Sequence, residues 1–367
     1  MEVLFVETFY GGSHKDFADQ WAARSSHRFT LETLPARFWK WRQAGSALYL
    51  AGKLPPCGHF DVVAVSGMID LAHLKALRPD LPPCLLYVHE NQFDYPLSPG
   101  EARDFRYGLT DLANVSCAEA AAFNSAYNRD SFLEGCLQLF SRLPDARPLT
   151  LVEEARRKIR IAPPGIDASA IDAAAARVSE TSPAGPSGRP LVIWNHRHEH
   201  DKDPDTTFRV LARLAARGIE FSLAILGQRF PDEPEAFDRA RRELAPRIVF
   251  DGYPDRKGYF EWLARGTAVV SSALQENFGL SVIEAARAGC FPMVPKRLAY
   301  PEVLPDSVHE ACLWRGEEEY EAMLEKILTS SDEERRRKTE PLARWLDRYD
   351  WAARATALDG ILEEISR

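Results

Sequence analysis

Short apolar runs alternate with longer amphipathic stretches along the first half of the chain. The apolar runs are rich in β-branched and aromatic residues and end at glycine or polar residues, which is typical of buried strands. They lie at 2–7, 61–65, 84–88, 121–123 and 160–162, with helical stretches at 69–77, 101–119 and 127–139. Strands that alternate with helices predict βαβ units around a parallel sheet.

The same alternation starts again in the second half. Strands are predicted at 191–195, 221–226, 247–252, 268–272 and 291–294, and helices at 204–217, 234–244, 255–265 and 279–288. The segment 181–190 is rich in proline, glycine and serine, as linkers are. The chain has 367 residues, and a single core rarely grows past about 250–300 residues. We therefore predict two doubly wound α/β domains, at 1–182 and 190–340, and a C-terminal helix at 341–367 that packs on the first domain.

Composition narrows the function classes. With 45% hydrophobic and 27% charged residues, the chain is typical of globular proteins. No apolar run approaches the roughly 18 residues of a membrane helix, and the N-terminus lacks a secretion signal, so we expect no membrane partner. The six cysteines form no C-x-x-C pair, which indicates reduced thiols in a cytoplasmic protein. Proteins that coat nucleic acid are usually basic, whereas this chain has a net charge of -8, so it could contact RNA only through a local patch.

The most informative chemical pattern follows a predicted strand of the second domain. The loop reads Glu276-Asn277-Phe278-Gly279, and the next helix carries Glu284. Carboxylates accept hydrogen bonds from sugar or ribose hydroxyls, and the free N–H groups near Gly279 favour anions. The pattern therefore predicts a site for a sugar joined to a phosphate. The alternative interpretation is two solvated acids.

A second polar segment, 195–204, follows the first strand of the second domain. Its Arg197 and Lys202 could clamp a diphosphate, which is the electrostatic task of a sugar-nucleotide transferase. Alternating histidines and a D-x-D spacing could instead bind a metal ion; they are His196, His198, His200, Asp201 and Asp203. The two cations among them would repel a metal ion, so we expect none. An exposed polar loop is the remaining alternative.

The first domain offers weaker signals. Gly11 and Gly12 follow the first strand and precede His14, and paired glycines let a backbone approach a ligand closely. The segment lacks the full G-x-G-x-x-G of dinucleotide-binding folds. His89 and Asn91 stand at the end of the strand 84–88 and suit sugar binding, although a structural histidine is the alternative. No G-x-S-x-G supports a serine nucleophile.

Basic and aromatic residues interleave near position 40. Arg37, Trp39, Lys40 and Arg42 could hold single-stranded nucleic acid through charge and base stacking. Taken alone, the segment is better explained by a pair of core tryptophans with surface charges.

Together these segments resemble a known group. Arg197, Lys202 and the pair Glu276 and Glu284 resemble the pattern of glycosyltransferase family 4 on a GT-B fold, with two Rossmann-like domains facing a central cleft. More narrowly, the chain is similar to the tRNA-queuosine alpha-mannosyltransferase family. The segments that carry this narrower resemblance are 9–15, 34–42, 46–49, 77–81, 89–92, 103–108 and 200–204.

The resemblance implies a metal-independent, retaining transferase with GDP-mannose as donor and queuosine at the wobble position of tRNA-Asp as acceptor. It places Arg197 and Lys202 on the diphosphate, Glu276 on the sugar, Glu284 on the ribose and His89 near the transferred sugar. The further expected donor contacts are Gly11, Gly12, Asn277, Phe278 and Gly279. The expected acceptor or RNA contacts are His14, Arg37, Trp39, Lys40, Arg42 and Asn91. The alternatives are another donor sugar, a small-molecule, lipid or polysaccharide acceptor, or a non-catalytic binding module.

Overall fold

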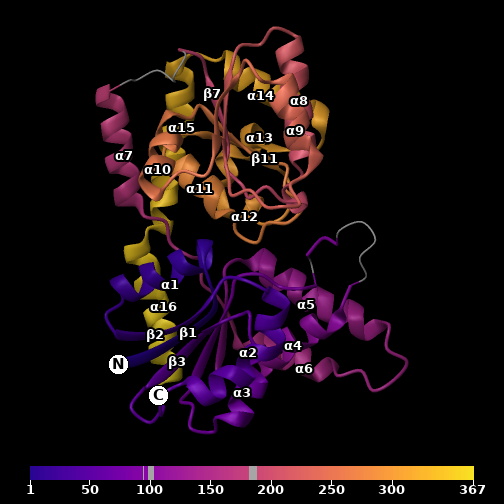
Figure 1. Cartoon of the computed structure of the whole chain (residues 1–367), viewed down its shortest axis with the longest axis vertical. Helices are drawn as coiled ribbons and strands as arrows, with labels where there is room; N and C mark the ends of the chain where they lie inside the picture. Colours follow the sequence, from indigo (N-terminus) through magenta and orange to yellow (C-terminus); the bar gives the residue numbers. More distant parts are fainter. Residues whose placement is uncertain (94, 98–102, 182–187) are drawn as a thin grey trace. The chain divides into compact units, whose positions relative to one another are not determined.

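The chain forms two compact units, seen in the computed structural model of Figure 1, which describes residues 1–93, 95–97, 103–181 and 188–367. The first unit contains residues 1–165 and 351–367, and the second unit contains residues 166–350. In the described residues each unit holds a six-stranded parallel sheet. The predicted α/β class with two doubly wound domains is thereby confirmed.

The first unit winds around the sheet order β2-β1-β3-β4-β5-β6. Its strands are β1 (Glu2–Tyr10), β2 (Arg28–Pro35), β3 (Val62–Ser66), β4 (Cys84–Val88), β5 (Ala120–Phe123) and β6 (Ile159–Ile161). Its helices are α1 (Gly12–Arg24), α2 (Trp39–Lys53), α3 (Leu71–Leu77), α4 (Phe105–Cys117), α5 (Ala126–Ser141), α6 (Leu149–Lys158) and α16 (Trp351–Ile365). The winding direction reverses between β1 and β3, and ligands of such sheets bind where it reverses.

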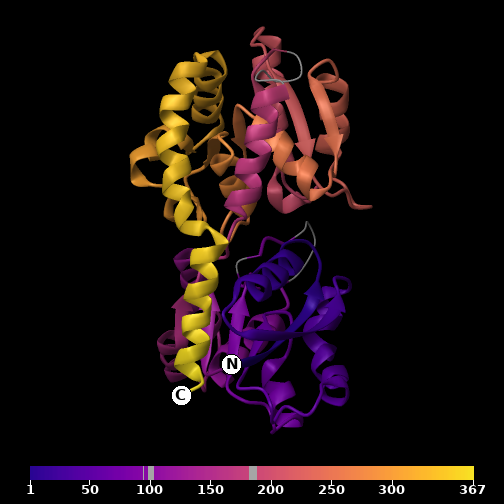
Figure 2. The same cartoon turned by 90° about the vertical axis from the view of Figure 1, so that its left-hand side faces the viewer.

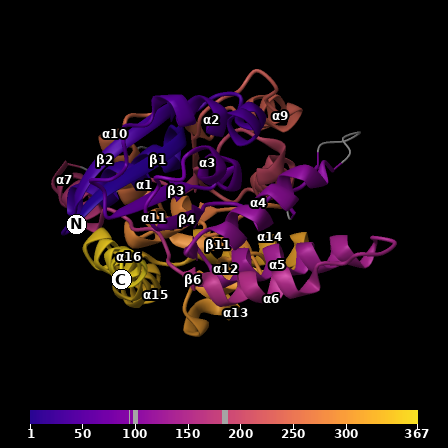
Figure 3. The same cartoon turned by 90° about the horizontal axis from the view of Figure 1, so that it is seen from below.

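Side chains of the first sheet alternate between two helical layers, because successive residues of a strand face opposite sides. Leu4 and Val6 pack with the layer of α2 to α6, whereas Val3 and Phe5 pack with α1 and α16. Figure 3 shows the strands between these layers, and Figure 2 shows α16 in yellow beside the sheet. Helix α16 is thus part of the hydrophobic core of the first unit.

The second unit winds around the sheet order β12-β11-β10-β7-β8-β9. Its strands are β7 (Leu191–Trp194), β8 (Ser222–Leu226), β9 (Ile248–Gly252), β10 (Ala268–Val270), β11 (Phe291–Pro295) and β12 (Leu313–Trp314). Its helices are α7 (Ala168–Thr181), α8 (Pro204–Ala216), α9 (Glu235–Glu243), α10 (Arg256–Arg265), α11 (Leu280–Arg287), α12 (Tyr300–Val303), α13 (His309–Cys312), α14 (Glu317–Thr329) and α15 (Asp332–Leu346). Short 3₁₀ turns lie at η1 (His200–Lys202), η2 (Asp306–Val308) and η3 (Asp347–Tyr349). The winding direction reverses between β7 and β10.

The boundary between the units differs from the prediction. The chain passes from the first unit to the second after Gly165, whereas a linker was expected at 181–190. The reason is that α7 buries Ile171, Ala174 and Val178 and packs on α10 and α11 of the second unit. Positions 182–187 of the expected linker lie outside the described residues.

The expected C-terminal helix is divided as well. Residues 341–350 belong to the second unit, where α15 packs on α11 and β11, and the chain enters the first unit only at Trp351. In the first unit, Trp21 Nε1 of α1 donates a hydrogen bond of 3.0 Å to Asp359 Oδ1 of α16. Among the described residues, no helix combines the length and the apolarity that crossing a membrane requires.

Candidate active site

Two loops meet where the winding of the second sheet reverses. One loop follows β7 and the other follows β10, and these strands are neighbours in the sheet. The N–H of Leu274 donates to the backbone oxygen of Asp201 at 2.8 Å, and Ser272 Oγ donates to the backbone oxygen of Asp203 at 2.6 Å. These bonds hold together two segments that are about 70 positions apart in sequence, as expected at the carboxyl ends of adjacent parallel strands.

Lys202 lies at the centre of this junction and is only 8% exposed. Its Nζ donates to the backbone oxygen of Gln275 at 2.7 Å and lies 3.1 Å from Asp201 Oδ2 and 3.6 Å from Glu276 Oε2. Burial alone would lower the pKa of Lys202, but the two carboxylates outweigh burial and the opposing charge of Arg197, so the pKa is raised. Lys202 therefore keeps its positive charge at neutral pH.

Arg197 is the second cation of the β7 loop. Its side chain is about half exposed and forms an ion pair of 3.0 Å with Glu199. Its positive charge opposes that of Lys202 and acts to lower the pKa of that lysine. Of the two cations predicted to clamp a diphosphate, the structure thus buries Lys202 and leaves Arg197 facing solvent, and their shared contact with a diphosphate stays a prediction.

Glu276 joins the loop to the start of α11. Its Oε1 accepts the N–H of Gly279 at 2.9 Å, and Gly279 has a left-handed φ of 86° that a side chain would strain. We expected the N–H groups near Gly279 to be available for an anion, but the Gly279 N–H is given to Glu276. Asn277 is buried and accepts a hydrogen bond of 3.2 Å from Gln275 Nε2, so its side chain shapes the loop from inside.

Two of the expected donor contacts are buried in the second unit. The ring of Phe278 packs edge-on against Tyr349 at 5.2 Å, so this side chain belongs to the core and offers no surface to a donor. Glu284 is also buried, and Arg256 donates to its Oε1 at 2.6 Å. A carboxylate that is paired in this way accepts a ribose hydroxyl only by sharing its lone pairs with Arg256.

The alternating histidines do not converge on one point. The ring of His198 is stacked on Phe237 at 4.0 Å and pairs with Glu233, whereas His200 is exposed. Burial, with the charge of Lys202, lowers the pKa of His196 to about 4, so this ring is neutral. Among the described residues, these histidines do not form a group with metal-ligand spacing.

A second polar cluster lies at the carboxyl ends of β1 and β4 in the first unit. Glu7 is fully buried and accepts hydrogen bonds of 2.7 Å from both the Phe9 N–H and Ser66 Oγ. His14 Nδ1 lies 3.3 Å from the same carboxylate, and the His14 and His89 rings are 4.0 Å apart. Burial, with the nearby His14, lowers the pKa of His89 well below its ordinary value.

This cluster orients His14, and its ligand atoms also have the spacing of a metal-ligand group. The ligand atoms of Glu7, His14 and His89 lie within 4.8 Å of one another. The planes of the two imidazole rings are tilted by 33°. A carboxylate only accepts hydrogen bonds, so Glu7 fixes the proton of His14 on Nδ1.

Sequence analysis did not single out Glu7, although a signal was present. Glu7 is an acid that directly follows the apolar run Val3–Val6 of its strand, and acids are rarely buried without partners. Asn91 was expected to contact the acceptor, but it is fully buried. Its Nδ2 donates to Asn128 Oδ1 at 2.8 Å and to Ser131 Oγ at 2.9 Å, so Asn91 fastens the loop after β4 to α5.

The paired glycines after β1 have different roles. A Cβ on Gly11 would lie 2.5 Å from the Cβ of Ala36, so Gly11 allows β1 and β2 to approach each other. Gly12 has a left-handed φ of 52°, and a Cβ there would meet no atom within 4 Å. Of the two glycines expected to contact the donor, only Gly12 therefore faces open space.

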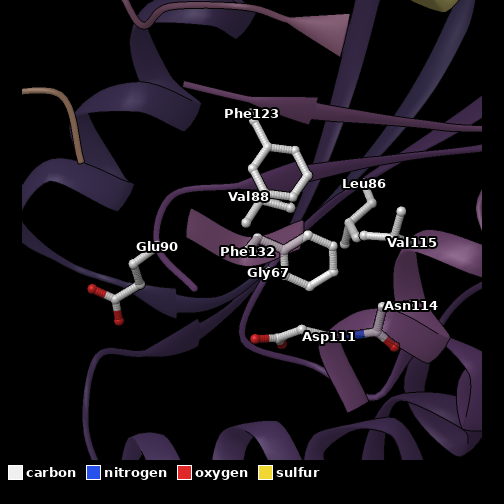
Figure 4. Close-up of a pocket in the computed structure, with 9 residues that line it drawn as sticks. All are labelled: Gly67, Leu86, Val88, Glu90, Asp111, Asn114, Val115, Phe123 and Phe132. Carbon is white, nitrogen blue, oxygen red and sulfur yellow. The ribbon is translucent and has the colours of Figure 1, made fainter. Parts of the chain in front are cut away.

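A small pocket lies at the carboxyl ends of β3 and β4 (Figure 4). Its apolar lining residues are Leu86, Val88, Val115, Phe123 and Phe132. In Figure 4 the carboxyl groups of Asp111 and Glu90 are turned to the side opposite Leu86 and Val115. Asp111 accepts a hydrogen bond of 2.8 Å from Gln43 Nε2. Burial raises the pKa of Asp111 well above its ordinary range, and the charge of Glu90 adds to this, so the neutral acid is favoured.

We expect Asp111→Asn to stabilise the first unit at neutral and alkaline pH. The unfolded chain releases this proton above about pH 3.9, whereas the folded chain retains it because its pKa is raised. The free energy of unfolding contributed by Asp111 therefore falls as the pH rises from about 4 toward the folded-state pKa. Urea unfolding, followed by hydrogen exchange in α4, should show the variant more stable at pH 7.5 and equal to wild type near pH 4. Glu134→Gln, at an exposed acid of α5, should show no such difference.

The residues expected to contact RNA lie at the start of α2. Arg37 and Lys40 are exposed, and Lys40 Nζ lies 5.5 Å from the centre of the Trp39 ring. Trp39 itself is half-buried against Tyr107, with ring centres 5.2 Å apart. Arg42 is half-buried and donates to the backbone oxygen of Pro35 at 3.2 Å. Of the two tryptophans, Trp41 rather than Trp39 is exposed, which sequence analysis had not distinguished.

Comparison with known proteins first defines a class. The sucrose-phosphate synthase of Thermosynechococcus elongatus matches with a TM-score of 0.72 and 14% identity, covering 99% of this chain and 98% of the other. Anabaena HepE in complex with UDP matches with a TM-score of 0.71 and 12% identity, covering 99% and 100%. The family model "Glycosyl transferases group 1" matches residues 189–332, which include Lys202 and Glu276. The chain is a nucleotide-sugar-dependent glycosyltransferase with a GT-B fold.

The particular family follows from the first unit. The family model "tRNA-queuosine alpha-mannosyltransferase N-terminal" matches residues 2–166. The tRNA-queuosine alpha-mannosyltransferase of Drosophila melanogaster is 33% identical over 308 residues, which are 83% of this chain and 81% of the fly protein. The chain belongs to the tRNA-queuosine alpha-mannosyltransferase family.

Proposed function

We propose that this chain transfers mannose from GDP-mannose to queuosine at the wobble position of tRNA-Asp, with retention at the anomeric carbon. The proposed tRNA acceptor is supported by the match of residues 2–166 to the N-terminal model of this family and by the name of the Drosophila relative. The observation that supports a nucleotide-diphosphate donor is the buried, charged Lys202 beside Arg197 at the end of β7.

The contacts of Lys202 indicate how a donor diphosphate is received. Of its three partners, Glu276 is the most distant at 3.6 Å, compared with 2.7 Å to Gln275 and 3.1 Å to Asp201. An incoming phosphate oxygen therefore replaces Glu276 most readily. The released carboxylate oxygen then accepts a hydroxyl of the transferred sugar, and Arg197 approaches the diphosphate from the solvent side.

Transfer with retention needs no protein nucleophile. The bond from the anomeric carbon to the leaving phosphate oxygen breaks while the bond to the acceptor oxygen forms on the same face of the sugar. The proton of the acceptor hydroxyl passes to the leaving diphosphate. Negative charge develops on that diphosphate, and preorganised cations such as Lys202 and Arg197 stabilise it more in the transition state than in the ground state.

The purified chain tests this proposal with tRNA that contains or lacks queuosine. We expect nucleoside mass spectrometry to show one added hexose with GDP-mannose and queuosine-containing tRNA, and none with UDP-sugars or with tRNA lacking queuosine. The product should be cleaved by an α-mannosidase, as retention from an α-linked donor requires. Activity should persist in EDTA, because the cations at the donor site are side chains. Transfer only from another nucleotide sugar, or only to a small molecule, would contradict the proposal.

A further inference from the structure

Helix α2 presents an aromatic stripe to solvent. Phe38, Trp41 and Tyr49 are 73%, 62% and 57% exposed, and Leu48 beside them is also exposed. Trp41, Leu48 and Tyr49 follow helical spacing and share one side of α2, while the opposite side is buried in the first unit. Among the described residues, the other exposed aromatic side chains outside α2 and Phe38 are Tyr253 and Phe105. Monomeric proteins seldom expose such a patch without using it.

The backbone is strained at Phe38, the first residue of this stripe. Phe38 precedes α2 with a left-handed φ of 56°, which is unfavourable for a residue with a side chain. The consequence is a phenyl ring held out in solvent. Strain that displays a side chain without burying it points to a binding role.

Gly45 adds a second local penalty in the same place. Glycine inside a helix is destabilising relative to alanine. Here a Cβ on Gly45 would lie 3.0 Å from the indole of Trp41, so the missing side chain lets that indole lie flat on the helix. The outer face of the indole remains exposed, and the arrangement is a flat platform of the kind on which a planar ring stacks.

The sequence segment that carries the stripe is basic, although the whole chain is acidic. The chain carries 54 acids and a net charge of -8, yet no Asp or Glu occurs between Thr33 and Phe60. Arg37, Lys40, Arg42 and Lys53 fall within that range. Two of these cations flank the aromatic rings, since the Arg37 guanidinium is 5.9 Å from the centre of the Phe38 ring and Lys40 lies over Trp39.

Side chains of α2 also contact α4. Gln43 Nε2 donates to Asp111 Oδ1 at 2.8 Å and to the backbone oxygen of Tyr107 at 3.4 Å, and Trp39 packs on Tyr107. Figure 3 shows α2 and the other helices of this layer on the same side of the first sheet. The stripe is therefore displayed on a preformed surface, which lowers the ordering cost of binding.

We propose that this surface, called the α2 face and defined by Phe38, Trp41, Leu48, Tyr49, Arg37 and Lys40, binds a single-stranded RNA loop. Unpaired bases stack on Phe38 and Trp41, and Arg37 and Lys40 meet the adjacent phosphates. A duplex hides the faces of its bases and cannot use such platforms, whereas a loop with splayed bases can. The α2 face thus selects the loop region of the tRNA acceptor, and in this respect it rests on the proposed function.

Direct tRNA binding, measured by fluorescence anisotropy, tests the α2 face whether or not transfer occurs. We expect Trp41→Ala to weaken binding about tenfold, as removal of one stacked base typically does. The double variant Arg37→Glu/Lys40→Glu should weaken it further and reduce the slope of log K against log salt by about 1.4, or 0.7 for each phosphate contact. The double variant Arg336→Glu/Arg337→Glu, at exposed residues of α15 with the same change in net charge, should bind like wild type.

Kinetics separate this proposal from the proposed function. For the α2-face variants we expect a raised KM for tRNA, an unchanged kcat at saturating tRNA and unchanged binding of GDP. If tRNA binding responds to salt and to the α2-face substitutions as expected but the wild-type chain transfers no mannose, the proposed function is wrong and the proposal that the α2 face binds RNA is supported. Unchanged tRNA affinity in both α2-face variants would overturn the α2 face. Loss of self-association in Trp41→Ala with tRNA binding intact would overturn it too, because the face would then serve a second copy of the chain.

Discussion

Replacing Lys202 with methionine should lower kcat for sugar transfer about 100-fold or more. The ammonium group of Lys202 is buried, charged and fixed by Gln275, Asp201 and Glu276. A preorganised charge of this kind stabilises a developing anion by about 3 kcal/mol, which corresponds to roughly 100-fold in rate. Methionine keeps most of the length of the side chain and removes the ammonium group with its charge and its hydrogen-bond donors. Steady-state kinetics at saturating donor and acceptor measure the effect.

The same experiment separates two roles for Lys202. If its charge acts mainly in the transition state, kcat and kcat/KM fall together, whereas a role limited to donor binding raises KM and leaves kcat unchanged. Lys257→Met, at an exposed lysine of α10, is the matched control and should be neutral. Because the variant leaves Asp201 and Glu276 without their cation, its circular dichroism and thermal midpoint must be compared with wild type. A folded Lys202→Met protein with near-normal turnover would remove Lys202 from the mechanism.

The meeting of Lys202 and Glu276 could be anticipated from sequence because it depends on topology. Both residues follow predicted strands, and the carboxyl ends of parallel strands lie at one edge of a sheet. Alternation of strands and helices was enough to predict that edge. The predicted strands agree with the structure to within a few residues in both units.

Side-chain burial could not be anticipated in the same way, because it depends on partners distant in sequence. Asn91 is buried, and its side chain donates a hydrogen bond to Asn128, which lies 37 positions further along the chain. Trp39 and Trp41 are equivalent by composition, and only the contact with Tyr107 decides which of them is half-buried. Phe278 looked like part of a donor loop, yet it packs on Tyr349.

The division of the chain was misjudged for a related reason. Proline and glycine at 181–190 indicate a loop, but a loop is not always a boundary between folding units. The preceding helix α7 has few charged residues and many alanines, and its apolar side chains have a docking surface on α10 and α11. Likewise, the strand β2 escaped prediction because it lies at the edge of the sheet and is only partly buried.

Gly227→Ala should abolish donor binding although Gly227 touches no proposed substrate atom. Gly227 follows β8, and an added Cβ would lie 1.9 Å from the backbone oxygen of His196 and 2.7 Å from the ring of His198. Backbone cannot yield like a flexible side chain, so the loop that carries Arg197 and Lys202 must move. Overpacking of this severity destabilises by about 3 kcal/mol, and displacement of both cations should weaken GDP binding by at least about 100-fold, or roughly 2.7 kcal/mol.

The neighbouring Gly252 provides the matched control. Its backbone oxygen accepts the N–H of Gly227 at 3.1 Å, but an added Cβ there would lie 3.4 Å from the Phe250 ring, which is ordinary contact. Calorimetric titration with GDP should therefore find Gly252→Ala close to wild type and Gly227→Ala without measurable binding. Hydrogen exchange should show the change confined to the second unit, because the first unit has its own core. Normal GDP affinity in Gly227→Ala would mean that the β7 loop does not form the donor site, and the roles of Arg197 and Lys202 would have to be reassigned together.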